Sequence, residues 1–282
     1  MSGLPGQASE GATATLATLA RIPYLNAAPF YVRWAEAPGT TVDLPPRALG
    51  EEARAGRADA GLMAAADWFT LDPAFARVGT LGIACRGPVS SVLLLSRRPF
   101  AELAHEGGAG VGLTVDLTTE SQTSVALTRI LLGGRYGLTR ATYRRRAVEA
   151  GEAPAGDAWL LIGDAALKAR REATRTGVHV LDLGAEWLSW TGLPFVYALW
   201  TVRASLPAEE KARLARFLEQ SLVEGERDLA ALANAAAVAQ PDLGGAAELT
   251  RYLAAFRYRL GPDEEAGLDR FRALWKEHGL DA

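Results

Sequence analysis

The sequence predicts an α/β protein with two lobes. Apolar segments of strand type alternate with helical segments as far as residue 200, which is typical of α/β folds with a largely parallel sheet. From Leu206 about seventy residues show helical periodicity and no alternating strand pattern. These helices need a sheet to cover, and the first lobe offers one. We therefore expect the chain to pass through lobe one, lobe two and lobe one again.

The composition narrows the class of protein. At 282 residues, with 49% hydrophobic and 22% charged residues, the chain can form two lobes with apolar cores. A net charge of −3 favours neither nucleic acid nor an anionic membrane as a partner. The first twenty residues lack the charged start and firm apolar core of a secretion signal, so we expect a disordered leader over residues 1–13 and a cytoplasmic protein. The oligomeric state stays open.

Metal and cofactor sites are not expected. Cys85 is the single cysteine, and the three histidines (His105, His179 and His278) lack metal-ligand spacing. Neither GxGxxG nor GxxxxGK[ST] follows a strand, so nothing indicates a nucleotide cofactor.

Residues 14–97 form the first part of lobe one in this interpretation. Its elements in chain order are a strand over 19–25, a helix opened by Pro29, strand 41–44, helix 47–55, strand 59–63, helix 64–69 and strands 78–84 and 90–96. Pro29 suits a first helical turn because its φ is already fixed, and Gly56 is a typical residue after a helix C-terminus.

Lobe two is expected over residues 98–198, and residues 199–282 return to lobe one. The elements of lobe two are strand 113–117, a helix reaching residue 132, strand 142–146, strand 158–163, helix 164–171, strand 178–183, helix 185–190 and strand 195–202. Beyond the end of that strand, apolar helical faces recur in the C-terminal segment, one of them formed by Leu249, Leu253 and Phe256.

A hydroxyl-rich corner follows the strand at 113–117. Five hydroxyl residues stand where this strand passes into a helix: Thr118, Thr119, Ser121, Thr123 and Ser124. A helix N-terminus presents free N–H groups and the positive end of the helix dipole, which suit a carboxylate or a phosphate. Ordinary N-capping by Ser121 or Thr123 is the alternative, but a cap needs one hydroxyl. We interpret Thr118, Ser121, Thr123 and Ser124 as an anion-binding site.

Other strand ends would place more polar residues in the same cleft between the lobes. Asn26 follows the first strand. Ser90 and Ser91 begin the strand at 90–96, beside the hinge that the two crossings between the lobes form. Gly163 and Asp164 follow the apolar run at 158–162. Each also has a structural interpretation: Asn26 and Asp164 as helix caps, and the two serines as edge-strand hydroxyls.

The predicted cleft holds neutral donors and few titratable groups. No histidine falls in its loops, which argues against a hydrolase triad. Phe195, Tyr197 and Trp200 lie along one strand and are expected in the core. Any chemistry here must depend on positioning and hydrogen bonding.

Five segments together resemble a known family. They are YLNAAPF (24–30), GPVSSVLLLS (87–96), TTESQTSVALTRILL (118–132), LLIGDAAL (160–167) and DLGAEWLSWTGLPFVYALW (182–200). These segments resemble the menaquinone-biosynthesis enzymes of the futalosine pathway, specifically the chorismate dehydratases. The resemblance implies a type II periplasmic-binding-protein-like fold with the ligand between two α/β lobes. It also implies a hydro-lyase that removes water from chorismate, a dicarboxylate, to give 3-[(1-carboxyvinyl)oxy]benzoate.

Residue roles follow from this resemblance as a hypothesis. Ser121, Thr123 and Ser124 would anchor one carboxylate, and catalytic Asn26 would position the enolpyruvyl side chain or the departing hydroxyl. Ser90 and Ser91, beside the hinge, would add hydrogen bonds to the substrate. The base is unassigned, and the side-chain carboxylate of the substrate is one candidate.

Two alternatives stay open. The sister enzyme makes 1,4-dihydroxy-6-naphthoate from cyclic de-hypoxanthine futalosine and resembles a family with a histidine base, for which this cleft offers no candidate. A non-enzymatic small-anion-binding protein would also suit the fold, but the N-terminus does not favour export.

Overall fold

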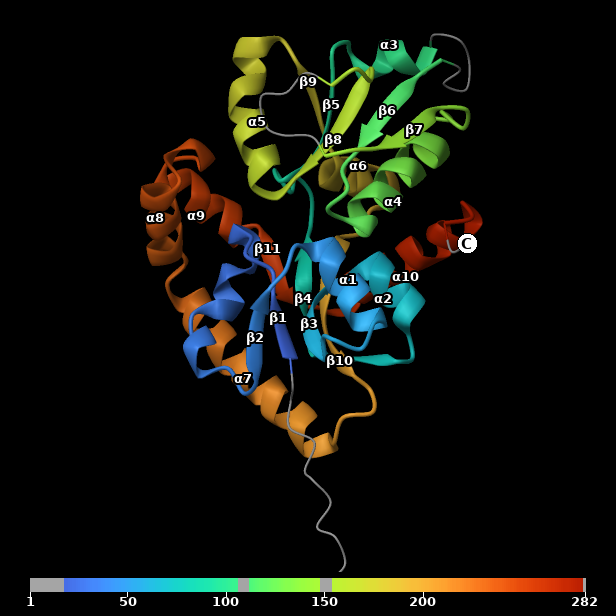
Figure 1. The fold of residues 1–282 in the computed structure, drawn as a ribbon. Coiled ribbons are helices and arrows are strands. Elements are labelled where there is room, and N and C mark those ends of the chain that lie inside the picture. Colours follow the sequence, from blue (N-terminus) through green and yellow to red (C-terminus); the bar gives the residue numbers. More distant parts are fainter. Residues whose placement is uncertain (1–17, 106–111, 148–153, 281–282) are drawn as a thin grey trace, which may run out of the picture.

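The structure is a computed structural model that describes residues 18–105, 112–147 and 154–280. Two α/β lobes are stacked, each with its own sheet (Figure 1). The expected leader over residues 1–13 lies outside the described residues. Among the helices in the described ranges, none has the length and hydropathy needed to cross a membrane.

Lobe one contains a six-stranded sheet in the order β11-β4-β10-β3-β1-β2. Its strands are β1 (Thr18–Arg21), β2 (Thr40–Asp43), β3 (Ala60–Ala64), β4 (Phe75–Cys85), β10 (Phe195–Arg203) and β11 (Phe256–Arg259). Lobe two contains a five-stranded sheet in the order β7-β6-β8-β5-β9. Its strands are β5 (Val92–Ser96), β6 (Thr114–Leu117), β7 (Thr142–Arg145), β8 (Ala158–Ile162) and β9 (His179–Asp182).

Both sheets are mixed, so the prediction of a largely parallel sheet is wrong. Strand β1 runs parallel to β2 and β3, and β6 runs parallel to β7 and β8, but β5 and β10 run antiparallel to both of their neighbours. These two are the first strands after each crossing between the lobes. A chain that arrives from the other lobe enters at the carboxyl ends of the parallel strands and must run against them.

The chain crosses between the lobes earlier than predicted. Strand β5 belongs to the sheet of lobe two and the whole of β10 to that of lobe one, so the crossings lie at residues 86–91 and 192–194. The predicted boundaries at 97/98 and 198/199 therefore assign β5 and the first half of β10 to the wrong lobe. Buried strands of either lobe are equally apolar, so their composition does not reveal the change of sheet.

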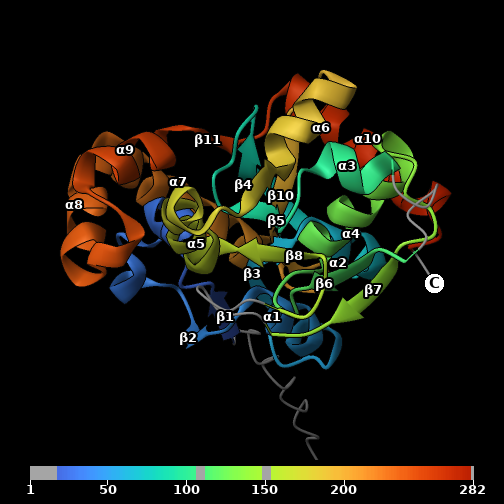
Figure 2. The same ribbon diagram turned by 90° about the horizontal axis from the view of Figure 1, so that it is seen from above.

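The helices cover these sheets. In lobe one they are η1 (Leu25–Tyr31), η2 (Trp34–Glu36), α1 (Pro46–Arg54), α2 (Ala65–Leu71), α7 (Ala208–Arg227), α8 (Leu229–Ala239), η4 (Pro241–Leu243), α9 (Ala246–Ala254) and α10 (Pro262–Glu277). In lobe two they are α3 (Phe100–His105), α4 (Gln122–Ile130), η3 (Leu131–Arg135), α5 (Gly163–Thr176) and α6 (Leu183–Thr191). The C-terminal helices pack mainly on lobe one, as predicted, and α10 also contacts α4 of lobe two (Figures 1 and 2).

One strand in the C-terminal segment was not predicted. Residues Phe256–Arg259 form β11, which pairs antiparallel with β4 at the sheet edge. Phe256 and Tyr258 alternate as buried residues along this strand. The stretch is too short for its alternation to stand out beside the long helical pattern before it, so the sequence pattern predicts a helical face that includes Phe256.

An aromatic core surrounds the second crossing. Trp187 of α6 and Phe271 of α10 both pack on Phe195, with ring centroids 5.1 and 4.8 Å apart. A Cβ on Gly267 of α10 would lie 2.1 Å from the carbonyl oxygen of Pro194, so only glycine permits this approach. The crossing is thereby held between a helix of each lobe.

Candidate functional site

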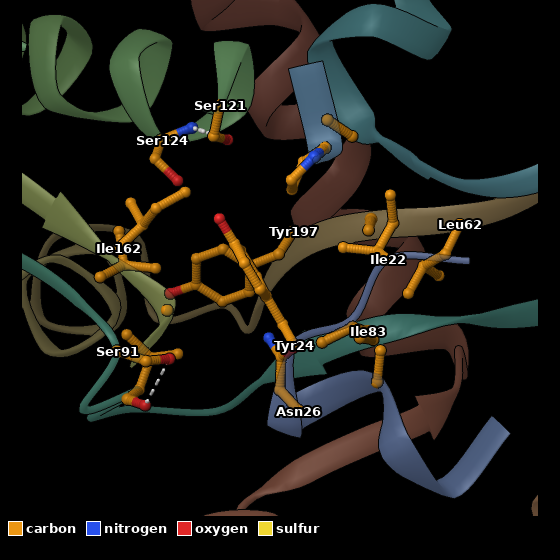
Figure 3. A pocket seen from close by; sticks show the side chains of 17 residues that line it. Ile22, Tyr24, Asn26, Leu62, Ile83, Ser91, Ser121, Ser124, Ile162 and Tyr197 are labelled. Atoms are coloured by element: carbon orange, nitrogen blue, oxygen red, sulfur yellow. Dashed lines mark hydrogen bonds between the residues drawn. The ribbon is translucent and has the colours of Figure 1, made fainter. Parts of the chain in front are cut away.

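A cavity lies between the two lobes, and we call it the central cavity (Figure 3). It holds about 590 Å³ of space free of atoms, part of which is open to solvent. Much of its wall is aliphatic, with Ile22, Leu62 and Ile83 from lobe one and Val92 and Ile162 from lobe two. A mostly apolar wall with a few polar groups is typical of a small-molecule site.

Polar side chains of both lobes face this cavity. They are Tyr24, Asn26, Ser91, Ser121, Ser124 and Tyr197. Among the described residues that line it there is no Asp, Glu, Lys, Arg or His. The central cavity is therefore furnished with neutral hydrogen-bonding groups.

Five of the nine predicted site residues line the central cavity. They are Asn26, Ser91, Ser121, Ser124 and Gly163. The structure does not bring the other four, Ser90, Thr118, Thr123 and Asp164, to its wall.

The N-terminus of α4 faces the cavity from lobe two. The Ser121 side chain caps this helix and accepts a hydrogen bond from the Ser124 N–H at 3.2 Å. The N–H groups of Gln122 and Thr123 lie in the first turn, where no intrahelical carbonyl can accept from them. The Ser124 side chain points into the cavity (Figure 3). The N-terminus of α4 is therefore capped by Ser121 and still offers free N–H donors to a ligand.

Asn26 faces the cavity from the opposite side (Figure 3). It belongs to the 3-10 helix η1, which begins earlier than the helix predicted at Pro29. Helix α7 fixes η1, because the Ser221 hydroxyl donates to the Phe30 carbonyl at 2.8 Å. A Cβ on Gly225 would lie 2.3 Å from the Pro29 carbonyl oxygen, so α7 packs directly on the backbone of η1. This packing sets the position of Asn26.

Ser91 links the cavity wall to the C-terminal helices. Its hydroxyl accepts a hydrogen bond from the Tyr252 hydroxyl of α9 at 2.9 Å and donates to the Val89 carbonyl at 3.5 Å. The donor of Ser91 is therefore already engaged, and the side chain joins a helix of lobe one to the start of β5.

Ser90 is turned away from the cavity at the first crossing. It adopts φ +65°, its N–H donates to Asp182 Oδ2 at 2.7 Å, and its hydroxyl accepts from Arg170. Asp182 Oδ1 also accepts from the Val89 N–H and caps α6 through Gly184 N–H, both at 3.0 Å. Asp182 thus holds the crossing segment in a fixed conformation.

Thr118, Thr123 and Asp164 also have other surroundings. Thr118 Oγ1 accepts from the Glu120 N–H at 3.1 Å. Thr123 Oγ1 accepts from the Ala66 N–H of α2 at 3.0 Å, a buried hydrogen bond between the lobes. Asp164 lies in the first turn of α5, where burial raises the pKa of its carboxyl group.

Two tyrosines of the cavity were not among the predicted site residues. The Tyr24 hydroxyl of lobe one donates to Glu120 Oε2 of lobe two at 2.7 Å. Its ring covers Gly163, which has φ +57° and whose Cβ, if present, would lie 3.1 Å from the ring. The Tyr197 side chain is 9% exposed, and its hydroxyl has no partner among the described residues. Tyr24 adjoins a predicted strand end and could have been found there, whereas Tyr197 follows the burial pattern of a core strand.

Both phenols act as donors at neutral pH. Burial raises the pKa of Tyr24, and hydrogen bonding to Glu120 raises it further. Burial also raises the pKa of Tyr197 well above its ordinary value. The cavity can therefore donate hydrogen bonds to a small organic anion from hydroxyl, amide and backbone N–H groups.

Known proteins resemble this chain in sequence and in fold. Chorismate dehydratase from Thermus thermophilus is 36% identical over 199 residues, which cover 65% of this chain and 70% of that protein. A solved structure from Archaeoglobus fulgidus has a TM-score of 0.73 at 14% identity, covering 93% of this chain and 97% of its own. A Candida albicans protein described as having the generic periplasmic binding protein fold has a TM-score of 0.62 at 10% identity, covering 94% and 90%.

These structures show that the fold is periplasmic-binding-protein-like, as the sequence predicted. The family model for menaquinone biosynthesis matches residues 17–277. The chain belongs to the menaquinone biosynthesis family.

Proposed function

We propose that the protein is a chorismate dehydratase, a hydro-lyase that converts chorismate to 3-[(1-carboxyvinyl)oxy]benzoate and water. The observation that carries this proposal is a cavity whose described wall has no charged side chain, with a helix N-terminus on one side and Asn26 on the other. The likeness to the Thermus thermophilus chorismate dehydratase supports the same substrate. We also assign the reaction to the futalosine route of menaquinone biosynthesis. We place the protein in the cytoplasm, and cell fractionation tests this location.

The reaction removes two groups from neighbouring ring carbons. The hydroxyl group leaves with the electron pair of its C–O bond. The hydrogen on the carbon that carries the enolpyruvyl ether leaves as a proton, and the electrons of that C–H bond complete the aromatic ring. Proton and hydroxide form water. Because the product is aromatic, the protein has to position the substrate and assist departure rather than supply a strong driving force.

Helix α4 would hold one carboxylate of the substrate. The N–H groups of Gln122 and Thr123 and the hydroxyl of Ser124 are suitable donors, and the helix dipole favours the negative charge. Thr123 would act through its backbone, since its hydroxyl is bound to the Ala66 N–H. Ser121 keeps these donors in place as the N-cap.

Asn26 and Tyr197 would act on the departing hydroxyl from lobe one. Both line the cavity opposite α4 (Figure 3). The Tyr197 hydroxyl retains its proton because burial raises its pKa, so it can donate to an oxygen that gains negative charge. The amide of Asn26 can both donate and accept, which suits a group that orients the substrate.

The proton would go to the enolpyruvyl carboxylate of the substrate itself. The described wall of the central cavity contains no carboxylate or imidazole, and its two phenols stay protonated at neutral pH. The enolpyruvyl group is attached to the carbon that loses the proton, so its carboxylate is held close to that C–H bond. This arrangement supplies a base at high effective concentration.

The test is to incubate the purified protein with chorismate alone and identify the product by mass spectrometry and NMR. We expect 3-[(1-carboxyvinyl)oxy]benzoate to form in equal amount to the chorismate consumed. Binding of chorismate without conversion would overturn the proposal in favour of an anion-binding protein. Conversion of cyclic de-hypoxanthine futalosine, with no action on chorismate, would favour the sister enzyme instead.

A further inference from the structure

A second cavity lies between the lobes on the other side of α4, and we call it the arginine cavity. It holds about 950 Å³ of space, part of which is open to solvent, and shares no lining residue with the central cavity. Helix α4 forms a wall of both: Ser121 and Ser124 face the central cavity, while Gln122, Val125 and Arg129 face the arginine cavity. The helical repeat of 3.6 residues separates these two faces.

The arginine cavity differs from the central cavity in the charge of the side chains that line it. Three guanidinium groups line it, from Arg54 of α1, Arg129 of α4 and Arg145 of β7, against one carboxylate, that of Asp67 of α2. Burial and the nearby charges of Arg47 and Arg129 lower the pKa of Arg145. The positive groups therefore repel one another, and an anion between them would relieve that repulsion.

The arginine of α4 is the one least engaged by the protein. Arg54 pairs with Asp67 Oδ1 at 2.8 Å, and Arg145 donates to the Thr118 carbonyl and to Gln122. Arg129 stacks on the Tyr143 ring at 5.4 Å, and within the described part of the chain no carboxylate pairs with it. Its donors can serve a ligand.

A buried acceptor completes the arginine cavity. The Asp67 side chain is 3% exposed, and its Oδ2 atom has no hydrogen-bond partner among the described residues. Burial raises the pKa of this carboxyl group, although Arg54 opposes the shift. A buried acceptor without a donor is unfavourable, so a ligand hydroxyl would find a ready partner here.

We propose that the arginine cavity is a second ligand site, which takes a small organic polyanion that carries a hydroxyl group. Arg129 and Arg145 bind its anionic groups, and Asp67 accepts from its hydroxyl. Residues of both lobes line the cavity, so the bound anion bridges them. The proposal does not depend on the reaction in the central cavity.

Isothermal titration calorimetry with citrate, a hydroxylated tricarboxylate, tests this site without chorismate. We expect saturable binding that weakens at least about tenfold in Arg129→Gln, because a charge-assisted contact is lost. Arg140→Gln is the matched control, since Arg140 is exposed on the same lobe and lines neither cavity. Absence of citrate binding, or equal weakening in both variants, would overturn the proposal.

Two further measurements locate the anion. Tricarballylate, which is citrate without its hydroxyl, should bind more weakly than citrate to the native chain, and Asp67→Asn should reduce that difference. Equal binding of the two compounds to the native chain would remove Asp67 from the site. Ser124→Ala, in the central cavity, should leave citrate binding unchanged, and loss of binding in that variant would place citrate in the central cavity and overturn the proposal.

Discussion

The two inter-lobe cavities share one helix and differ in charge. The central cavity has no charged side chain on its described wall, whereas three arginines and one buried aspartate line the other. A guanidinium group beside a carboxylate lowers its pKa and makes it a weaker base. Neutral donors bind the carboxylate with a smaller loss of basicity. If the substrate's own carboxylate removes the proton, exclusion of arginine from the central cavity preserves its strength as a base.

Ser124→Lys would break this difference and should have the largest effect. An ammonium group in the central cavity would attract the carboxylates of the substrate and so retain binding. Its positive charge would also lower the pKa of the enolpyruvyl carboxylate that acts as the base, which should lower kcat on the order of a hundredfold. Ser124→Met is the control, because its side chain is also long but has no charge. Steady-state kinetics of both variants separates charge from bulk. Equal losses of kcat in the two variants would contradict the inference that an uncharged cavity wall preserves the basicity of the substrate carboxylate.

Asn26→Ala should lower kcat roughly tenfold or more, because a positioned polar group is lost from the central cavity. Asn234→Ala, on the exposed face of α8, is the matched control and should keep native kinetics. Normal turnover of the Asn26 variant would remove this residue from the mechanism.

Tyr197→Phe should lower kcat about fivefold through loss of one hydrogen bond to the departing oxygen. Tyr258→Phe is a close control: its hydroxyl is also buried and without a partner among the described residues, but it does not line the central cavity. Both changes remove an unsatisfied buried hydroxyl, so neither should lower the thermal midpoint. An equal effect on kcat in the two variants would indicate a structural cause.

The pH dependence should show the smallest effect. Burial raises the pKa of Tyr24 and Tyr197, so both keep their protons at higher pH than an ordinary tyrosine. Any loss of activity through their ionisation therefore occurs at higher pH. We expect kcat/KM to vary less than about twofold between pH 6 and 9. Asp164→Asn should leave this profile unchanged. An acidic limb within that range that disappears in the Asp164 variant would identify a protein base.

The sequence predicts the order of the helices and strands along the chain better than it predicts which strands pair in each sheet. Alternation located most strands and helices, because it is set by local burial. It did not show that β5 had entered the second sheet, since a buried apolar strand is alike in either lobe. Nor did it reveal β11, which is strand-like only because the edge of β4 pairs with it.

The candidate site divides in the same way. Asn26, Ser121 and Ser124 were found because strand ends and helix starts lie together at one edge of a sheet. The directions of other hydroxyls depend on distant residues: Thr123 is bound by Ala66, and Ser90 by Arg170. Local sequence holds no information on such long-range partners.

The position of Cys85 has a practical consequence. This single cysteine ends β4 at the first crossing and lies opposite Phe195, the first residue after the second crossing. Burial raises the pKa of its thiol to about 12, so very little thiolate exists at neutral pH. The side chain is 2% exposed, and its sulfur atom lies against the carbonyl groups of Gly87 and Pro88 in the first crossing. A thiol reagent can therefore react only after this crossing segment moves away, and the reaction rate becomes a chemical reporter of that local opening.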